Sequence, residues 1–349
     1  MDPRGLTPPT LPTLPTPPTP PTPPTPPTPT MAPAPAPGPP VLVVVGPTGS
    51  GKSTLAVDLA LALRGEVVNA DSMALYRGMD IGTATPTAAE RRGVPHHLFG
   101  VLDPREDASV AAYQTRARAA VEGLRAAGTA TVVVGGSGLH LRALLDDLDF
   151  PGTDPALRAA LEAEAAELGT GALHARLAAL SPETAARVPP GNARRVVRAL
   201  EVLALTGRPP TAVLPDPGPA RWGAVQVGLD PPLDVLDARI SARTDALYDA
   251  GLVEEVRALD AAGLGRTAAR AIGYASVLRL LAGEVTAAQA REETARATRR
   301  LVRRQRSWWR RDTRIRWLPW SALSAAYDGE PEALVRVALA HLAGAGPAG

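Results

Sequence analysis

The 349-residue chain contains no cysteine, only one lysine, and twelve aromatic residues. The lack of cysteine excludes disulfide bonds and thiolate metal sites, which fits a reducing cytoplasm. No apolar run approaches the roughly 20 residues that a membrane-spanning helix needs, the best being Val41–Val45. We therefore expect a soluble, cytoplasmic monomer that has no membrane partner.

The basic residues are unevenly distributed along the chain. The formal net charge of +2 is too small to indicate a nucleic-acid-binding protein by itself. Eleven arginines, however, lie between Arg291 and Arg316, where only three acidic residues accompany them. The positive charge is therefore concentrated near the C-terminus.

Residues 1–40 differ in composition from the rest of the chain. They are almost entirely Pro, Thr, Ala and Gly, and they lack the apolar core of a signal peptide. Such a segment cannot bury surface, so we expect a disordered or polyproline II tail. Met31 lies just before the folded region, and we hypothesise that translation begins there. An intact mass of the natively expressed protein that includes residues 1–30 would refute this hypothesis.

From Val41 onward the pattern indicates an α/β protein. The strand Val41–Val45 is followed by a glycine-rich loop and by a helix over Ser53–Arg64 that places leucines on one face. This order is typical of a P-loop NTPase-like fold, in which helices cover both faces of a parallel sheet. Further strands are predicted over Glu66–Asp71, Thr129–Gly136 and Gly223–Leu229.

The remaining segments favour helices. Residues 150–190 carry no strand signal and predict a helical insertion between the α/β core of residues 41–149 and the region of residues 191–320. After Pro231 the chain is predicted to be helical through Arg311, with Leu233–Leu259 and Thr286–Trp309 as the longest helices. We interpret residues 321–349 as a C-terminal tail.

The loop after the first strand has the pattern G-x-x-x-x-G-K-[ST]. Its glycines permit close approach of the backbone, and its NH groups and the following helix dipole can hold a diphosphate or polyphosphate. The one lysine of the chain lies here, as a compact charge that can contact oxygens of two phosphates, and the next serine can ligate Mg²⁺. The loop consists of Gly46, Pro47, Thr48, Gly49, Ser50, Gly51, Lys52 and Ser53.

The ends of the neighbouring strands carry few acids. An ordinary NTPase has an acidic residue there to hold Mg²⁺ and orient water, but the strand at Thr131–Val134 ends in glycines and Ser137. We find only Asp71 at a strand's carboxyl end, so Asp71 and Ser137 should face the same crevice as the loop. One acid beside a bound diphosphate suggests a general base, although a helix cap or turn residue explains Asp71 equally well from its position alone.

Several motifs in order resemble tRNA dimethylallyltransferases over residues 41–320. They are the loop Gly46–Ser53, Asp71-Ser72-Met73, Tyr76–Ala84, Val94–Leu98, Asp103-Pro104, Val134–Leu139, Arg194–Val202 and Ile272-Gly273-Tyr274. The resemblance implies transfer of a dimethylallyl group from dimethylallyl diphosphate to N6 of adenosine 37 in the anticodon stem-loop of tRNA, with Mg²⁺ as cofactor.

The resemblance also assigns roles to residues. Lys52, Ser53 and the rest of the loop, with Arg243, would bind the diphosphate, Asp71 would accept the proton from N6, and Ser137 would support the leaving oxygen. The helical insertion would face the tRNA. The expected tRNA-binding residues are Asp71, Ser72, Met73, Ala74, Ser137, Arg158, Arg194, Arg195, Val196, Val197, Arg198, Arg270, Gly273, Tyr274, Arg303, Arg304 and Gln305.

Two positions depart from the family pattern. Ser137 stands where the family usually has threonine, and His140 stands where it commonly has tyrosine. His140, like His96 and His97, has no partner at metal-ligand spacing, so we interpret all three as structural or hydrogen-bonding residues.

The segment Arg296–Arg311 alternates arginines with tryptophan, a composition suited to phosphate contacts and base stacking. We expect the arginines to contact RNA, because too few acids lie nearby in the sequence to pair them. For Trp308 and Trp309 we favour burial in the core.

Other functions use the same loop. A small-molecule kinase, an isopentenyltransferase for free nucleotides, and a non-catalytic RNA-binding protein are the alternatives. The absence of an acid after Thr131–Val134 and the basic, tryptophan-containing C-terminal segment favour the tRNA enzyme.

The replacement Lys52→Arg tests the function of the lone lysine. Charge is retained, but we expect dimethylallyl transfer to fall by more than about tenfold, because a planar guanidinium does not fit a curved nest of NH groups. The measurement is the rate of prenyl incorporation into tRNA, with the melting temperature as a control for folding. A variant that folds and transfers at the wild-type rate would contradict the prediction.

Overall fold

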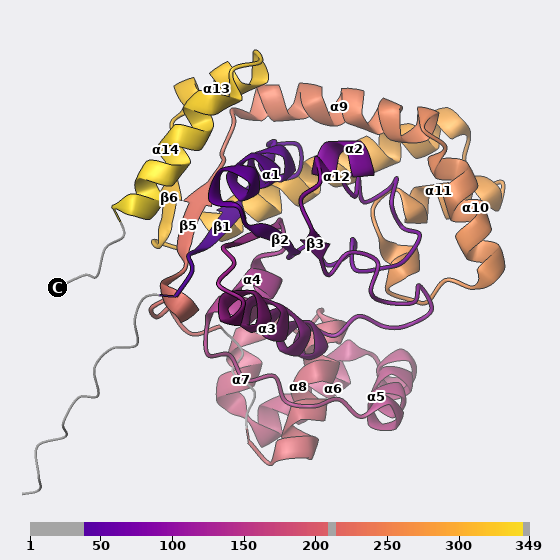
Figure 1. Ribbon diagram of the computed structural model, residues 1–349. Helices are drawn as coiled ribbons and strands as arrows, with labels where there is room; N and C mark the ends of the chain where they lie inside the picture. Colours follow the sequence, from indigo (N-terminus) through magenta and orange to yellow (C-terminus); the bar gives the residue numbers. More distant parts are fainter. Residues whose placement is uncertain (1–37, 209–213, 345–349) are drawn as a thin grey trace, which may run out of the picture. The chain divides into compact units, whose positions relative to one another are not determined.

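The computed structural model describes residues 38–208 and 214–344 (Figure 1). The expected tail over residues 1–40 therefore lies almost entirely outside the described residues. The strands are β1 (Val41–Val45), β2 (Glu66–Asn69), β3 (His96–His97), β4 (Thr131–Gly135), β5 (Val225–Gly228) and β6 (Ile315–Trp317).

Helices account for most of the remaining structure. They are α1 (Lys52–Leu63), α2 (Ala88–Arg91), α3 (Val110–Ala126), α4 (Gly138–Leu145), α5 (Pro155–Leu168), α6 (Thr170–Leu180), α7 (Pro182–Arg187), α8 (Ala193–Thr206), α9 (Leu233–Asp249), α10 (Leu252–Ala262), α11 (Tyr274–Leu281), α12 (Ala287–Trp309), α13 (Trp320–Tyr327) and α14 (Pro331–Ala343), with 3₁₀ turns at Arg221–Gly223 and Ala268–Arg270.

The six strands form one parallel sheet in the order β3-β2-β4-β1-β5-β6. This confirms the predicted fold class and the four predicted strands, whose ends differ by a few residues. The strands β3 and β6 were not predicted, because neither has an apolar run in the sequence. The strand His96–His97 is two residues long, and Ile315–Trp317 lies in the arginine-rich segment.

Helices cover both faces of the sheet, as expected for a parallel sheet (Figure 1). Val41, Val43 and Val45 of β1 pack against α3 and α4 on one face. Leu42 and Val44 pack on the other face in a core that includes residues of α1, α13 and α14. The interpretation of residues 321–349 as a tail was therefore wrong for α13 and α14, whose Leu323 and Leu334 are buried in this core.

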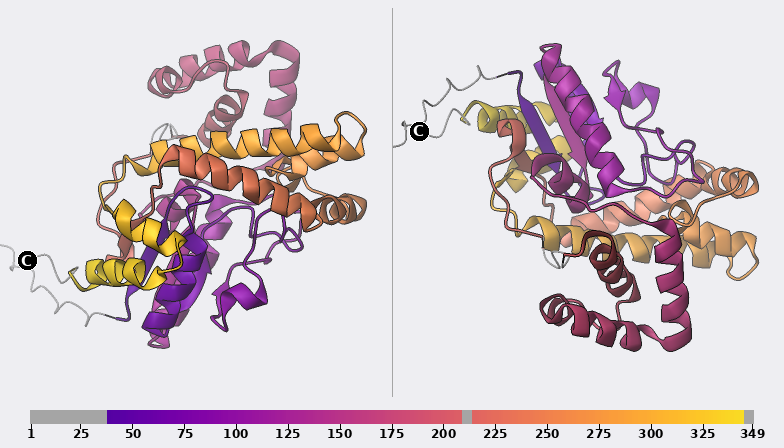
Figure 2. Two further views of the ribbon diagram at one scale, coloured as in Figure 1. Left: turned by 90° about the horizontal axis from the view of Figure 1, so that it is seen from above. Right: turned by 90° about the horizontal axis from the view of Figure 1, so that it is seen from below.

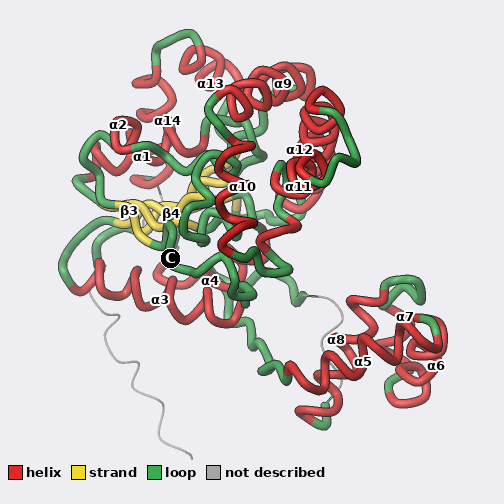
Figure 3. Tube along the Cα trace, turned by 90° about the vertical axis from the view of Figure 1, so that its right-hand side faces the viewer, coloured by secondary structure: helices red, strands yellow, loops and turns green. Residues whose placement is uncertain are grey.

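Helices α5–α8 pack on one another around their own small core, as Figure 3 shows. Helix α8 belongs to this bundle, so the helical insertion extends to Thr206 rather than ending at residue 190. Glu201 connects α8 to the rest of this bundle. Its side chain is fully buried and binds Arg158 of α5 at 2.5 Å and Arg198 of α8 at 2.7 Å.

The helices after β5 differ from the prediction in one place. The expected helix Leu233–Leu259 is interrupted at Gly251, whose φ of 100° ends α9 and begins α10. Helix α12 occupies the predicted range and lies beside α9, as both views of Figure 2 show. Within the described ranges, no helix is both long and apolar enough to cross a membrane.

Candidate active site

The carboxyl ends of four neighbouring strands meet at one edge of the sheet. The glycine-rich loop follows β1, Asp71 follows β2, Ser137 follows β4 and Asp230 follows β5. This confirms that Asp71 and Ser137 lie at the same edge as the loop. Asp71 is not the only acid at this edge, however. Asp230 lies there as well, and it was not predicted from the sequence.

The loop adopts the conformation that a phosphate-binding nest requires. Gly49 and Gly51 have φ values of 86° and 81°, which side chains with a Cβ rarely adopt. Helix α1 begins immediately afterwards at Lys52, so its unpaired NH groups face the loop. Lys52 Nζ lies 3.4 Å from the carbonyl oxygen of Pro47, which holds the lysine along the loop.

Lys52 lies in an environment that disfavours its charge. Burial, which the charge of Asp71 opposes and the nearby Arg243 reinforces, lowers the pKa of its ammonium group to about 8. Burial also lowers the pKa of Arg243, and Asp71 again opposes the shift. One acid and two cations therefore share a desolvated site, which leaves a net positive charge for an anion.

Asp71 is held in place by its neighbours. Its backbone NH donates to Asn69 Oδ1 at 2.8 Å, and Asn69 Nδ2 donates to the carbonyl oxygens of Asp71 and Leu98. Asp71 Oδ1 accepts from the backbone NH of Met73 at 2.9 Å. The turn thus orients the carboxylate and leaves its Oδ2 without a hydrogen bond from the described residues, so the turn role and a chemical role are compatible.

Ser137 contacts a buried histidine. Its Oγ lies 2.8 Å from Nδ1 of His140, one turn further along the chain. The His140 ring packs against Tyr113, with ring centroids 4.6 Å apart, and the Tyr113 hydroxyl donates to the carbonyl oxygen of Asn69. Burial lowers the pKa of His140 to about 4, although Asp71 opposes the shift. The expected hydrogen-bonding role of His140 is confirmed.

Helix α12 connects two of the loops at this edge. Gln305 Oε1 accepts from the NH of Thr48 at 2.9 Å, and Gln305 Nε2 donates to the carbonyl oxygen of Gly136 at 3.0 Å. Gln305 is buried, so it holds the loops after β1 and β4 together and does not present its amide to a ligand. Its expected contact with tRNA is therefore not supported.

The two tryptophans of α12 differ. Trp309 is 1% exposed and lies in the core, as expected, whereas Trp308 is 38% exposed, contrary to expectation. A Cβ added to Gly138 would overlap the indole of Trp308, so the indole lies directly against the start of α4. Trp308 is therefore placed beside Ser137 with part of its surface accessible.

Two residues brace the glycine-rich loop from outside it. Arg239 Nε of α9 donates to the carbonyl oxygen of Gly49 at 2.9 Å, and the Tyr327 hydroxyl of α13 donates to that of Ser50 at 3.0 Å. The Arg239 guanidinium also lies 4.0 Å from the centroid of the Tyr327 ring. The brace was not predicted. Arg239 could have been noticed one turn before Arg243, but nothing in the sequence places Tyr327 next to the loop.

The arginines of α12 are mostly paired, contrary to the expectation that too few acids lie nearby. Arg306 and Arg310 bind Asp230 at 2.5 Å and 3.2 Å, and Arg303 binds Asp237 at 3.3 Å. These acids are more than sixty residues away in the sequence and reach α12 only through the fold.

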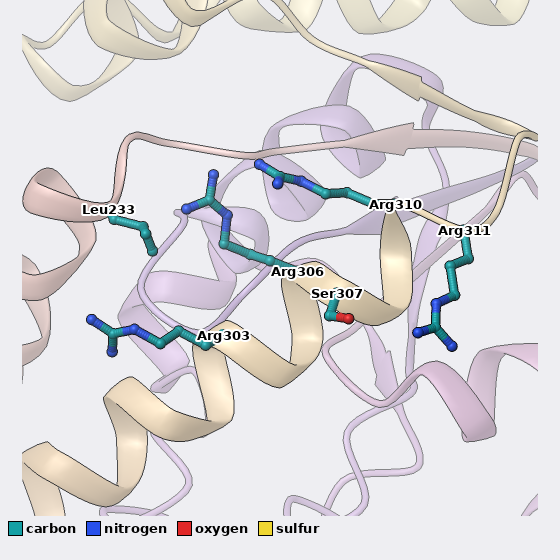
Figure 4. A pocket seen from close by; sticks show the side chains of 6 residues that line it. All are labelled: Leu233, Arg303, Arg306, Ser307, Arg310 and Arg311. Carbon is teal, nitrogen blue, oxygen red and sulfur yellow. The ribbon is translucent and has the colours of Figure 1, made fainter.

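A pocket of about 380 Å³ lies on this side of α12. Figure 4 shows Arg303, Arg306 and Arg310 extending on the side of Leu233 at the start of α9, while Arg311 points away. The acids Asp230 and Asp237 offset part of the positive charge of this pocket.

Three other arginines, two in α12 and one just after its end, form a different face. Arg300, Arg304 and Arg311 have no acidic partner in the described part of the chain, and all three are exposed or nearly so. With Trp308 they recur every three or four residues, which places them along one side of the helix. We call Arg300, Arg304, Trp308 and Arg311 the free face of α12.

Several other residues that were expected to bind tRNA are buried or are bound to other side chains of the protein. The side chains of Ala74, Val196, Val197 and Tyr274 are buried in the core, so direct contact of these side chains with RNA is not supported. Arg158 and Arg198 bind Glu201, as described above. Arg194, Arg195 and Arg270 are exposed, and Ser72 and Met73 are half-buried next to Asp71.

Tyr274 helps to hold the loop that follows Asp71. Its hydroxyl donates to Glu255 at 2.5 Å, and Glu255 accepts from the backbone NH groups of Asp80, Ile81 and Gly82. Burial and this hydrogen bond raise the pKa of Tyr274. The motif Ile272-Gly273-Tyr274 therefore supports the loop indirectly, and Glu255, which sequence analysis missed, is the residue that connects them.

The side chains near the glycine-rich loop suit a metal ion that is bound mainly by phosphate oxygens of a ligand. No group of three or more His, Asp or Glu side chains within residues 38–208 and 214–344 could hold a metal. Ser53 is exposed in the first turn of α1, so its hydroxyl can reach an ion bound to phosphates at the loop. Mg²⁺ commonly binds in this way, through few protein ligands and substrate oxygens.

The hydrogen bond from Tyr327 to the glycine-rich loop predicts that Tyr327→Phe weakens anion binding. Loss of the hydrogen bond to Ser50 should weaken binding of inorganic pyrophosphate by about threefold to tenfold, the usual range for one hydrogen bond. Isothermal titration calorimetry measures the change. The matched control is Tyr248→Phe, which removes a hydroxyl bonded to Thr294, away from the loop. Equal affinities of the two variants would contradict the role of Tyr327.

Comparisons with known proteins agree with this arrangement. A sequence model of the IPP transferase family matches residues 74–312. The tRNA dimethylallyltransferase of Thermobifida fusca is 59% identical over 81% of this chain and 90% of its own, and that of Salinispora arenicola is 61% identical over 80% and 82%.

Solved structures show the same relationship. The full-length tRNA isopentenylpyrophosphate transferase of Bacillus halodurans superposes with a TM-score of 0.60 at 35% identity, covering 86% of this chain and 97% of that one. A eukaryotic dimethylallyltransferase acting on tRNA shares the fold, with a TM-score of 0.66 at 24% identity over 80% of this chain and 73% of that one. The chain therefore belongs to the IPP transferase family.

Proposed function

We propose that this enzyme transfers a dimethylallyl group from dimethylallyl diphosphate to N6 of the adenosine at position 37 of tRNA. The observation that carries the proposal is the shared site of Asp71, Lys52 and Arg243, which joins an oriented acid to a diphosphate-binding loop. The names of the similar proteins, tRNA dimethylallyltransferases, support the same activity.

The loop end of the site would hold the donor. The NH groups of the loop and of the first turn of α1, together with Lys52 and Arg243, would bind the diphosphate. As the bond between the allylic carbon and oxygen breaks, negative charge grows on the leaving diphosphate, so these groups stabilise the transition state more than the ground state. Mg²⁺ held by Ser53 and the diphosphate would supply further positive charge.

Asp71 would serve the acceptor. The N6 lone pair attacks the allylic carbon while the diphosphate leaves with the electrons of the carbon–oxygen bond, and the resulting N6 cation loses a proton to Asp71. An exocyclic amine is a weak nucleophile, so most of the catalytic effect comes from orientation of the amine in line with the carbon. The hydrogen bonds that fix Asp71 relative to Asn69 and Met73 serve this orientation.

Ser137 would contact the leaving group. It lies at the end of β4, next to β1 and its loop, and Gln305 ties the two loops together. A hydroxyl at this place can donate to the oxygen that takes up charge, as donors in oxyanion holes do.

A small-molecule kinase, the alternative function, would need a free carboxylate at the end of β4 to hold Mg²⁺, and the described structure has none there. Asp230 is the other acid at this sheet edge, and it is bound to Arg306 and Arg310.

The free face of α12 would contact the tRNA. Its arginines lack acidic partners within the described ranges, and Trp308 leads from them to Ser137. Phosphate contacts by arginine and stacking on an accessible indole suit an RNA loop whose base is turned outward into the site. We further propose that the enzyme acts as a monomer in the cytoplasm.

Incubation of the protein with labelled dimethylallyl diphosphate, Mg²⁺ and unmodified tRNA tests the proposed activity. We expect label in adenosine after nuclease digestion of the tRNA. In Asp71→Asn the transfer rate should fall by at least about a hundredfold, because the amide cannot accept the proton, while tRNA affinity stays near wild type. Robust ATP turnover without label in tRNA would overturn the proposal, and an unchanged rate in the variant would remove Asp71 from the base role.

The two faces of α12 provide a matched comparison. Arg300→Gln with Arg304→Gln removes two unpaired cations, whereas Arg296→Gln with Arg310→Gln removes two paired ones, from the same helix and from its C-terminal end. We expect the first variant to lose about tenfold in tRNA affinity and to show a shallower salt dependence, and the second to lose less than about threefold. Filter binding at several salt concentrations measures both, and equal losses would exclude a special role of the free face.

A further inference from the structure

His140 and Ser137 form a buried pair whose hydrogen-bond direction can be derived. The ring is neutral at ordinary pH, because burial lowers its pKa to about 4. One ring nitrogen therefore carries a hydrogen and the other does not. Nδ1 contacts Ser137 Oγ at 2.8 Å, and Nε2 is buried without a partner among the described atoms.

The unpartnered Nε2 selects between the two tautomers. A hydrogen on Nε2 would be a buried donor without an acceptor, whereas a hydrogen on Nδ1 leaves only an unused acceptor at Nε2. Orphaned buried N–H donors are rarer than under-satisfied acceptors. The hydrogen therefore belongs on Nδ1, and it points to the Ser137 oxygen.

The direction of this bond determines what the serine can do. A hydroxyl that accepts from His140 keeps its own single hydrogen for another acceptor. The reverse direction would direct the serine hydrogen to the ring and turn only lone pairs toward an anionic ligand.

We propose that His140 is a positioning residue, whose Nδ1–H donates to Ser137 Oγ so that the serine hydroxyl hydrogen is directed to the leaving oxygen of the diphosphate. This inference rests on the proposed function. The ring is itself held by Tyr113, whose hydroxyl is bound to Asn69. Tyr113 and Asp71 are the titratable groups that affect this region, and the charge of Asp71 acts on both rings.

The contact also restricts the rotation of the serine side chain. A threonine hydroxyl is restricted by its β-branch, whereas a serine hydroxyl has more rotamers available. A hydrogen bond from His140 supplies a restriction that serine itself lacks.

A mutant cycle tests the proposal. His140→Phe should lower kcat by about tenfold with KM for both substrates within about twofold, because a directed donor to the leaving group is lost. The same replacement should cost less than about threefold in a Ser137→Thr background, where the β-branch orients the hydroxyl, and should have no further effect after Ser137→Ala. A merely structural histidine would lower kcat by the same factor in all three backgrounds, which would overturn the proposal.

A second pair of variants covers the case in which His140→Phe does not fold. The amide nitrogen of His140→Asn can occupy the place of Nδ1, whereas that of His140→Gln reaches the place of Nε2. We expect the asparagine variant to retain kcat within about threefold and the glutamine variant to lose about tenfold. Equal rates would overturn the inference, provided that the wild-type enzyme prenylates tRNA. A wild-type enzyme without that activity would instead refute the proposed function.

Discussion

The site depends on a buried ammonium group that needs an anion. Burial and Arg243 both work against the charge of Lys52, and Asp71 offsets them only in part. In the proposed function a diphosphate would supply the missing negative charge, and the same cations would stabilise the additional charge that develops when it leaves carbon. Desolvation thus makes each of these interactions stronger than it would be in water.

A second requirement is that the loops at the sheet edge keep their relative positions. Backbone carbonyls and NH groups of the loops are bound by side chains from distant parts of the chain, namely Gln305, Arg239 and Tyr327. Glu255 does the same for the loop after Asp71. Binding groups that are fixed in advance need no reorganisation during the reaction, which is why such bracing matters for catalysis.

Helix α12 both holds the loops in place, through Gln305, and carries the residues that we propose contact RNA. One side of the helix pairs its arginines with Asp230 and Asp237, Gln305 and Trp309 point into the protein, and the free face remains accessible. Ion pairs with α9 and with the end of β5 fix the helix, so the unpaired arginines project from a rigid support. The division of these arginines into a paired set and an unpaired set, which we propose contacts RNA, follows from which acids the fold brings near.

The sequence determined the sheet, the phosphate loop, and the edge at which Asp71 and Ser137 lie, because strand periodicity and a loop of contiguous residues are local properties. It did not reveal the short strands β3 and β6 or the packing of α13 and α14, since their stability comes from neighbours and not from local pattern. Likewise, the partner of each arginine, the burial of Tyr274 and the contact between Ser137 and His140 involve geometry that folding creates. Which side chains face a ligand depends on the folded protein, because burial and pairing involve residues far apart in the chain.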